Sequence, residues 1–326
     1  MHDELKFGLQ RKFGIFGLFV VILLFAGLTF YVVSLFNPPS PSEEEVNNSS
    51  TNTSKVLLPL AHDIIPDANP EEFLVVLSSL AKEVSLIDTA TEKIVERITL
   101  AHEPDFGFFD KTQGRLYISH SDDYVISVVS IKNRILVRRI ELTEKPGDLV
   151  VADGLIYVII PEKNKVFIID PLTEAVEKEI VVGKEPQRIA ASNDASLLYV
   201  SNFRSDEVQI INPSVQAISN SIRINSRPLG LGLSHTERYL VVTNSVESKI
   251  TIVPIKFPKR TRSVGVEATP SSVAFTPRDQ LVLVTNEGSN VVSFVSLSQD
   301  KVVDRVEVGI SPVDIVISRN GTPQHI

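Results

Sequence analysis

The sequence predicts an all-β fold, a six-bladed β-propeller of four-stranded antiparallel blades that follows one N-terminal transmembrane helix. Two periodic features predict the propeller: a proline recurs at intervals of 42, 40, 42, 42 and 42 residues, and a short alternating strand pattern recurs at the same intervals. Repeats of this length with four strands each are typical of propeller blades. An uncharged apolar run of 23 residues near the N-terminus predicts the helix.

Three features recur in each copy of the repeat. The prolines are Pro104, Pro146, Pro186, Pro228, Pro270 and Pro312. The alternating pattern ends at Asp88, Ser130, Asp170, Asn212, Pro254 and Ser296. A β-branched aliphatic residue follows ten positions later, at Ile98, Ile140, Ile180, Ile222, Val264 and Val306. β-Branched and aromatic runs separated by Asn, Asp, Ser, Gly and Pro indicate four strands per copy.

The two ends of the repeat region predict how the ring closes. The first copy begins at a second strand, over residues 73–79, and the last copy stops after an innermost strand, over residues 313–318. Pairing this C-terminal strand with the first sheet closes blade one, gives six blades and removes the open sheet edges. The alternative is a seventh blade, which would need strands from residues 56–72, a stretch with one strand pattern and several prolines.

The apolar run, residues 14–36, is long enough for a membrane span, because a helix of this length reaches about 35 Å and a hydrocarbon core is about 30 Å thick. Lys6, Arg11 and Lys12 precede the run, and the next basic residue is Lys55. This asymmetry predicts a single-pass protein in the lipid bilayer, with a cytoplasmic N-terminus and an extracytoplasmic propeller at the cell surface or in the periplasm. The alternative is a cleaved signal peptide, whose apolar region is shorter.

The chain changes composition after the apolar run. Residues 37–72 begin with prolines, three consecutive glutamates and a Ser/Thr/Asn tract, which predict a stalk and lead-in. Asn47, Asn48 and Asn52 each begin an N-x-S/T sequon and are glycosylation candidates. The predicted organisation is a cytoplasmic tail (1–13), the transmembrane helix (14–36), the stalk (37–72), the propeller (73–318) and a C-terminal tail (319–326).

Composition excludes several kinds of chemistry. The 326 residues contain no cysteine, so disulfides, thiolate metal sites and cysteine nucleophiles are excluded. Acidic residues outnumber basic ones by 40 to 32, which disfavours nucleic acid as a partner. No P-loop, HExxH, GxSxG or EF-hand spacing occurs. The sequence therefore predicts no cofactor.

The second strand of several copies reads LLYVSN (197–202), LVVTN (240–244) and LVLVTN (281–286), with LYISH (116–120) as a weaker copy. On these residues the domain resembles the YVTN-type β-propeller repeat family over residues 73–318. The resemblance implies a propeller fold and relatives among surface-layer and envelope proteins, lactonase-like hydrolases and haem d1 domains. The third copy, LIYVIIPEKN (155–164), is two residues short and lacks the Asn, so we expect its strand to be kept and its loop geometry to differ.

Candidate binding residues lie where a propeller commonly binds ligands, on the loops around the channel mouth. Two residues after their prolines stand Asp148, Arg188 and Asp314, which predict a site for a small polar ligand or an ion. The loop residues grouped with them are Asn202, Asn244, Asn286 and Arg227. The alternatives are that Arg188 pairs with Asp148 and plugs the channel, and that each Asn supports its own turn.

Two further groups have both a functional and a structural interpretation. His102, His120 and Asp122 are candidate metal ligands, since imidazole and carboxylate bind zinc or manganese, and the alternative is a set of solvent-exposed loop residues. The basic segment PKRTR (258–262) is either a docking patch or a charged outer strand that protects a sheet edge.

The function predicted from these features is a membrane-anchored, non-catalytic binding or scaffold module for an envelope or surface partner, a protein or a glycan at the loop face. The alternative is a lactonase-like hydrolase with a metal in the channel. A metal would need several convergent carboxylates, whereas only Asp148 and Asp314 qualify and Arg188 opposes a cation.

Overall fold

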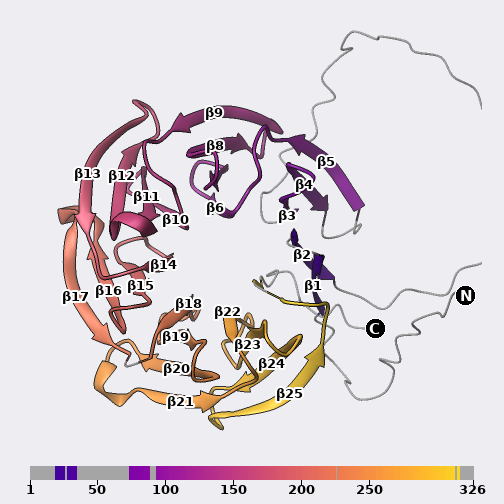
Figure 1. The fold of residues 1–326 in the computed structure, drawn as a ribbon, viewed down its shortest axis with the longest axis vertical. Helices are drawn as coiled ribbons and strands as arrows, with labels where there is room; N and C mark the ends of the chain where they lie inside the picture. Colours follow the sequence, from indigo (N-terminus) through magenta and orange to yellow (C-terminus); the bar gives the residue numbers. More distant parts are fainter. Residues whose placement is uncertain are drawn as a thin grey trace, which may run out of the picture.

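The computed structural model describes residues 19–25, 28–34, 73–88, 93–224, 226–312 and 314–315. Six β-sheets stand in a ring, and consecutive sheets lie side by side (Figure 1). Within each sheet the strands follow chain order and pair antiparallel. The prediction of a six-bladed, all-β propeller is therefore confirmed.

Blades 2 to 6 each contain four strands, which run in order from the channel outward. Blade 2 contains β6 (Phe106–Asp110), β7 (Arg115–His120), β8 (Val125–Ser130) and β9 (Ile135–Glu141). Blade 3 contains β10 (Leu149–Ala152), β11 (Leu155–Ile160), β12 (Lys165–Asp170) and β13 (Ala175–Val181). Blade 4 contains β14 (Pro186–Ala191), β15 (Leu198–Asn202), β16 (Glu207–Asn212) and β17 (Ala217–Arg223).

Blade 5 contains β18 (Pro228–Leu233), β19 (Tyr239–Asn244), β20 (Lys249–Pro254) and β21 (Arg262–Gly265). Blade 6 contains β22 (Pro270–Phe275), β23 (Leu281–Asn286), β24 (Val291–Ser296) and β25 (Lys301–Glu307). Within the described residues, short 3-10 helices occupy three connections: η2 (Pro161–Lys163), η3 (Pro213–Val215) and η4 (Pro258–Arg260).

Blade 1 contains β3 (Phe73–Ser78), β4 (Glu83–Asp88) and β5 (Lys93–Thr99), and two strands precede them, β1 (Phe19–Phe25) and β2 (Leu28–Ser34). The structure thus has strands within the run for which the sequence predicts a helix, and the predicted helix is not shown. The run is rich in β-branched and aromatic residues, which favour strands as well as apolar helices. In the part of the chain that the structure describes, no helix is long and apolar enough to cross a membrane.

The strand beside β3 also differs from the prediction. β2 pairs with β3 through Phe30 and Ser78, at the position predicted for the C-terminal strand. Of the predicted closing strand, only Asp314 and Ile315 are described, and neither belongs to a strand. Ile315 is buried and belongs to the apolar cluster of the last blade. The end of the described chain therefore packs on blade 6, and its predicted pairing with β3 is not shown.

Several other predictions fall on residues outside the described ranges. These are the cytoplasmic tail (1–13), the stalk (37–72), the glycosylation candidates Asn47, Asn48 and Asn52, and the C-terminal tail (319–326).

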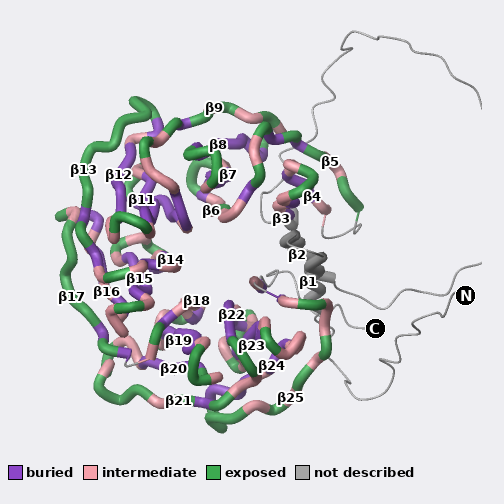
Figure 2. The backbone as a smooth tube through the Cα atoms, viewed as in Figure 1, coloured by how far each residue is buried: buried purple, intermediate pink, exposed green. Residues whose placement is uncertain are grey.

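The outermost strand of each blade is the least buried (Figure 2). The second and third strands are almost wholly buried, as in β8, where all six residues are buried. The outermost strands are exposed, and in β13 and β17 the only buried residues are Ile180 and Ile222. These belong to the recurring aliphatic position ten residues after the third strand. That position therefore holds the outermost strand on its blade.

The hydrophobic core lies between neighbouring blades. One cluster joins Val150, Tyr157 and Ile168 of blade 3 to Leu198 and Val200 of blade 4. Other clusters join blades 1 and 2, blades 2 and 3, blades 4 and 5, and blades 5 and 6. A fully buried aliphatic side chain contributes about 1.5–3 kcal/mol. Apolar contacts between neighbouring blades therefore stabilise the ring.

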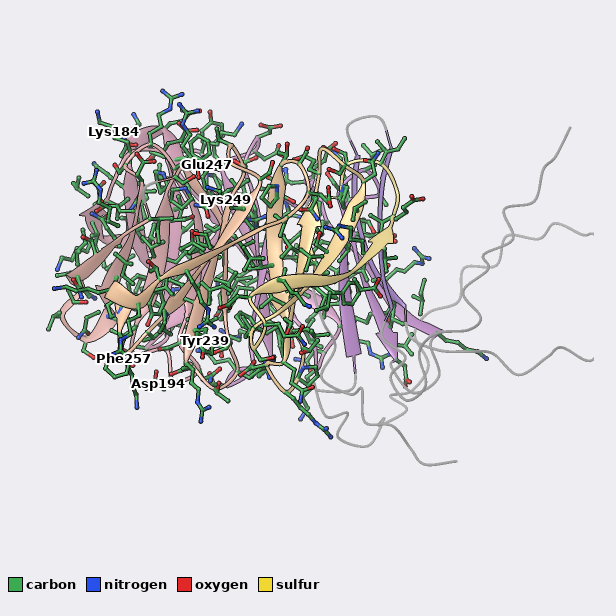
Figure 3. All side chains as sticks on the ribbon, turned by 90° about the horizontal axis from the view of Figure 1, so that it is seen from below. Lys184, Asp194, Tyr239, Glu247, Lys249 and Phe257 are labelled. Carbon is green, nitrogen blue, oxygen red and sulfur yellow. The ribbon has the colours of Figure 1, made fainter. Side chains whose placement is uncertain are left out.

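The propeller has two distinct faces. The loops that lead into each innermost strand and those that join the second to the third strand lie on one face, the loop face. The turns that join the first to the second strand and the third to the fourth strand lie on the other, the turn face. Figure 3 shows them edge-on, with Lys184 and Glu247 on the loop face and Tyr239 and Phe257 on the turn face.

A side-chain hydroxyl near the end of the second strand explains part of the repeated motif. The innermost strand of blade 4 has an irregular register at its start, and the N–H of Arg188 there donates to Ser201 Oγ at 3.0 Å. Ser201 Oγ also donates to the carbonyl oxygen of Leu229 in blade 5 at 2.8 Å. Blades 5 and 6 have the same N–H to hydroxyl bond, from Gly230 to Thr243 and from Ser272 to Thr285. The Ser or Thr before the motif Asn thus stabilises the channel end of the strand.

The third copy differs as the sequence predicts. Its second strand, β11, is present. The shorter connection between β10 and β11 is a tight turn in which both Asp153 and Gly154 have positive φ. After β11, the helix η2 replaces the turn that follows the motif Asn elsewhere, and Asn164 ends it in the left-handed conformation.

Candidate functional site

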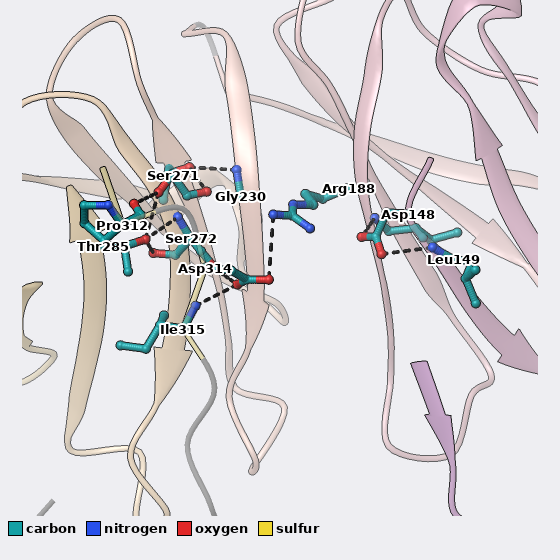
Figure 4. Close-up of polar contacts among 12 residues, drawn as sticks. Asp148, Leu149, Arg188, Gly230, Ser271, Ser272, Thr285, Pro312, Asp314 and Ile315 are labelled. Carbon is teal, nitrogen blue, oxygen red and sulfur yellow. Dashed lines mark hydrogen bonds and ion pairs between the residues drawn. The ribbon is translucent and has the colours of Figure 1, made fainter. Parts of the chain in front are cut away.

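Arg188 is the central residue of the channel group (Figure 4). Its guanidinium lies 3.8 Å from Asp314 Oδ2 and stacks over the ring of Phe106, 4.6 Å from the ring centre. Figure 4 shows the side chain extending between Asp148 and Asp314. The structure therefore brings together the three predicted channel residues. The structure has an ion pair between Arg188 and Asp314. The alternative predicted from the sequence is a pair with Asp148, which stands at the same position in the preceding copy of the repeat.

Asp148 is held by backbone donors from two blades. Its Oδ1 accepts the N–H of Leu149 at 2.9 Å, and its Oδ2 accepts the N–H of Ile189 in blade 4 at 3.0 Å. Burial raises the pKa of Asp148 to about 6, and the nearby Arg188 guanidinium and the two N–H groups oppose this rise. Asp148 therefore connects blades 3 and 4, in a copy that has Ile159 where blades 2, 4, 5 and 6 have Ser or Thr.

Asp314 stands at the same repeat position and has a similar set of partners. Its Oδ1 accepts the N–H of Ile315 at 2.8 Å and a hydrogen bond from the hydroxyl of Ser272. Its other oxygen faces Arg188. Both channel carboxylates are thus already bonded to N–H, O–H or guanidinium donors, which leaves them little freedom to coordinate a cation.

The three motif asparagines are buried at the ends of β15, β19 and β23. Asn244 donates through Nδ2 to the carbonyl oxygen of Ser226, and its Oδ1 accepts the hydroxyl of Thr251 at 2.7 Å. Asn286 donates to the carbonyl oxygens of Val284 and Val291 and to a serine hydroxyl. Asn202 donates to Val200 O at 3.4 Å. The amides of Asn244 and Asn286 thus support the loop-face turns, and all three amides are buried.

His120 occupies the same repeat position as the asparagines and has the same role. Its Nε2 lies 2.8 Å from Ser127 Oγ, and its Nδ1 lies 2.9 Å from Glu103 O. Asn244 and Thr251 are also seven residues apart. Burial lowers the pKa of His120. Both ring nitrogens are engaged by the protein, so His120 has no free nitrogen for a metal.

The other candidate metal ligands have partners of their own. His102 Nδ1 lies 3.0 Å from Asp123 Oδ1, and its ring centre lies 5.6 Å from that of His120. Asp122 is mostly exposed and pairs with Lys145 at 2.7 Å. Among the described residues, no three or more His, Cys, Asp or Glu side chains are grouped in a way that could hold a metal ion.

Arg227 lies outside the channel, on the exposed loop face. Its N–H donates to Asp206 Oδ1 at 2.8 Å, and its guanidinium lies 5.8 Å from the ring centre of Phe203. Val246, on the next second-to-third-strand loop, is 59% exposed. Three residues that contact the predicted site residues are not themselves among them. Phe203 directly follows a motif Asn. Phe106 and Ser272 stand two residues after their prolines, at the repeat position of Arg188.

Comparisons with known proteins support the fold. No protein-family model matches the sequence, and no curated protein sequence matches it. Hydrazine synthase of Kuenenia stuttgartiensis is similar in structure, with a TM-score of 0.67 and 16% identity over 78% of this chain and 88% of that chain. A functionally unknown protein from Desulfotomaculum acetoxidans has a TM-score of 0.67 and 15% identity over 77% and 86% of the two chains. At these identities the likeness shows the propeller fold alone.

Proposed function

We propose that this chain is a YVTN-type propeller that acts as a non-catalytic binding module, anchored in a membrane by residues 14–36 with the propeller on the extracytoplasmic side. Its partner is a protein or a glycan that contacts the loop face. Three features support the proposal: the repeated second-strand motif, the apolar run with the basic residues before it, and the side chains of the loop face.

The observation that carries the non-catalytic part is the position of Arg188. Its guanidinium lies beside Asp314 and over the ring of Phe106, and its charge also acts on Asp148. A cation in this channel would meet a fixed positive charge a few ångströms away, which is repulsive. The channel chemistry is therefore suited to holding blades together or to an anionic ligand group, and less suited to a metal-activated water.

The loop face offers residues of the kind that dominate protein and glycan recognition. Arg and aromatic side chains are enriched at binding hot spots. Phe203 and Arg227 present a ring and a guanidinium from neighbouring loops, and Val246 adds exposed apolar surface. Ion pairs such as Lys249–Glu247 and Lys145–Asp122 lie on the same face. This arrangement resembles the apolar centre and polar rim of an interface.

One observation favours the second candidate, a hydrolase. Burial raises the pKa of Asp148 to about 6, a value suited to a general base near neutral pH. Hydrolysis of a panel of lactones by the purified full chain tests this candidate, with metal content measured on the same sample. Turnover that is lost in Asp148→Asn, together with one bound metal per chain, would replace the binding proposal with the hydrolase. No turnover above the variant's background supports a structural carboxylate.

The anchor is tested by fractionating membranes that contain the full chain. We expect the chain to float with the lipid after extraction at alkaline pH and in high salt, since an apolar span resists both treatments. Release by either treatment would contradict the anchor.

The binding face is tested by placing a photo-crosslinking amino acid at Val246 in the native membrane. The matched control position is Val181, which is 68% exposed and lies on the outermost strand of blade 3. We expect a defined crosslinked product from the loop-face position and none from the outer strand, with loss of the product in Arg227→Ala. Equal products from both positions, or none, would contradict a binding loop face.

A further inference from the structure

Blade 5 departs from the repeat on the turn face. Between its third and fourth strands, β20 and β21, the chain has seven residues (255–261), whereas blade 3 has four (171–174). Its outermost strand is correspondingly short, four residues against seven in blade 3. Residues that form an outer strand elsewhere are therefore displayed in a longer turn, which we name the blade 5 projection (residues 255–261).

The projection is ordered and carries unpaired positive charge. The N–H of Phe257 donates to Pro254 O at 2.9 Å, and the N–H of Arg260 donates to Phe257 O at 2.8 Å, around the helix η4. Lys256, Lys259 and Arg260 are exposed, and none of them forms an ion pair with another described residue. The chain as a whole has a net charge of −8, so this local excess of positive charge stands out.

An exposed aromatic ring accompanies the charges. Phe257 is 58% exposed, and the Arg260 guanidinium lies 5.1 Å from its ring centre. The turns of the two preceding blades also expose large apolar side chains at the same edge, Leu172 at 69% and Val215 at 62%. Aromatic and aliphatic side chains beside Lys and Arg are typical of surfaces that lie against anionic membranes.

The structure argues against the alternative of edge protection. Lys256, Lys259 and Arg260 belong to a connection and not to an outer strand. Arg262 is the residue of the basic segment that lies on the edge strand β21, and it is engaged by Leu297 O at 3.0 Å and by the ring of Tyr239. The exposed charges of the projection therefore have no sheet edge to protect.

The first strand of the repeat region begins on the face that carries the projection. β3 starts at Phe73, which pairs with Asp88, the last residue of β4. In blade 5 the equivalent first residue of the second strand is Tyr239, which pairs with Pro254. Figure 3 shows Tyr239 and Phe257 on the same face. The chain therefore enters β3, after the apolar run, from the turn face of the disc.

From these observations we propose that the blade 5 projection docks on the anionic lipid headgroups of the membrane in which the chain is anchored, with Phe257 at the headgroup level. This inference rests on the membrane anchor of the proposed function. Docking holds the turn face against the bilayer and turns the loop face, with Phe203 and Arg227, toward its partner.

The test uses Phe257→Trp, because the chain contains no tryptophan and the variant has a single indole. The full chain is reconstituted in vesicles of phosphatidylcholine, with or without phosphatidylglycerol. We expect the emission of the indole to shift to shorter wavelength only in the anionic vesicles. The shift should disappear at 1 M salt, where the Debye length is about 3 Å, and in the same protein with Lys256, Lys259 and Arg260 changed to Gln.

The matched control is Val246→Trp, a position with nearly the same exposure as Phe257 that lies on the loop face of the same blade. Its emission should be the same in both kinds of vesicle. Equal shifts in the two variants, or a shift in Phe257→Trp that persists without the three charges, would overturn the proposal. A shift with polyglutamate and none with anionic vesicles would also overturn it, because the projection would then bind an acidic protein.

Flotation of the same samples at alkaline pH separates this proposal from the anchor. A chain that floats but gives no charge-dependent shift retains the anchor and contradicts the docking. A chain that is released at alkaline pH, yet shifts in anionic vesicles, retains the docking surface and contradicts the anchor.

Discussion

The substitution Asp148→Asn tests the description of the channel through the dependence of stability on pH. Burial raises the pKa of this carboxyl in the folded protein to about 6, against its ordinary value of 3.8. The folded state therefore binds the proton more tightly than the unfolded state. Below about pH 3.8 the carboxyl group is protonated in both states and does not lower the stability of the folded protein. As the pH rises to about 6 the folded protein loses stability, and above that value the cost stays constant.

The size of the effect follows from the two pKa values. A rise from 3.8 to about 6 corresponds to about 3 kcal/mol. Asp148 keeps part of its surface exposed, so this value is an upper limit. Asparagine has one acceptor oxygen, and the N–H of Leu149 or Ile189 would lose its partner, which costs about 1 kcal/mol at every pH. The variant should thus be less stable than the native chain near pH 4 and more stable by up to about 2 kcal/mol near pH 7.5.

Thermal unfolding of the full chain, followed by far-ultraviolet circular dichroism between pH 4 and pH 8, measures this difference. For a domain of this size 1 kcal/mol corresponds to about 2–4 °C in Tm. The difference in Tm between variant and native chain should therefore change by about 5–10 °C across the range. Titration of the other carboxyl groups cancels in the difference. A difference in Tm that is independent of pH would refute the raised pKa of Asp148 and the burial that causes it.

Substitutions at three further positions test the repeat and the channel. Gly230→Ala should lower stability by about 1–3 kcal/mol, because its Cβ would lie too close to a backbone oxygen of blade 6, and a Tm within about 1 °C of the native value would contradict this close approach. His120→Asn should cost less than about 1 kcal/mol and His120→Ala about 2–3 kcal/mol, since Asn retains a bond to Ser127. Equal losses in denaturant unfolding would contradict the shared role. Arg188→Gln removes the charge that lowers the pKa of Asp148, so the midpoint of its pH effect should move to higher pH, and an unchanged midpoint would contradict their coupling.

The periodic part of the fold could be predicted from the sequence, because each copy repeats the same burial requirement. The aliphatic position of Ile180 and Ile222 is buried in the structure as its recurrence requires. The spacing of the prolines likewise predicts where the innermost strands β14, β18 and β22 begin. A pattern that recurs in every blade predicts the structure well, because every copy must pack against its neighbours in the same way.

The sequence predicts which residues form the candidate site, but not which of them pair with one another. The repeat places Asp148, Arg188 and Asp314 at the channel, and the structure brings them together there. Arg188 pairs with Asp314 because its long side chain crosses the channel in that direction. The spacing of residues in the sequence does not determine this direction. The buried roles of His120, Asn244 and Asn286 depend on partners seven residues away on the next strand, as in Asn244–Thr251.

In the proposed arrangement the loop face points away from the membrane and the turn face lies against it. The chain contains no cysteine, so Val246→Cys and Val215→Cys each supply a single thiol, with 59% and 62% exposure on the loop face and the turn face. Labelling with a membrane-impermeant maleimide on intact cells, and again after detergent release, measures the orientation. We expect Val246→Cys to react faster than Val215→Cys on intact cells, and this difference to disappear when detergent is added. Equal reaction of both thiols on intact cells, or no reaction of either, would contradict this orientation.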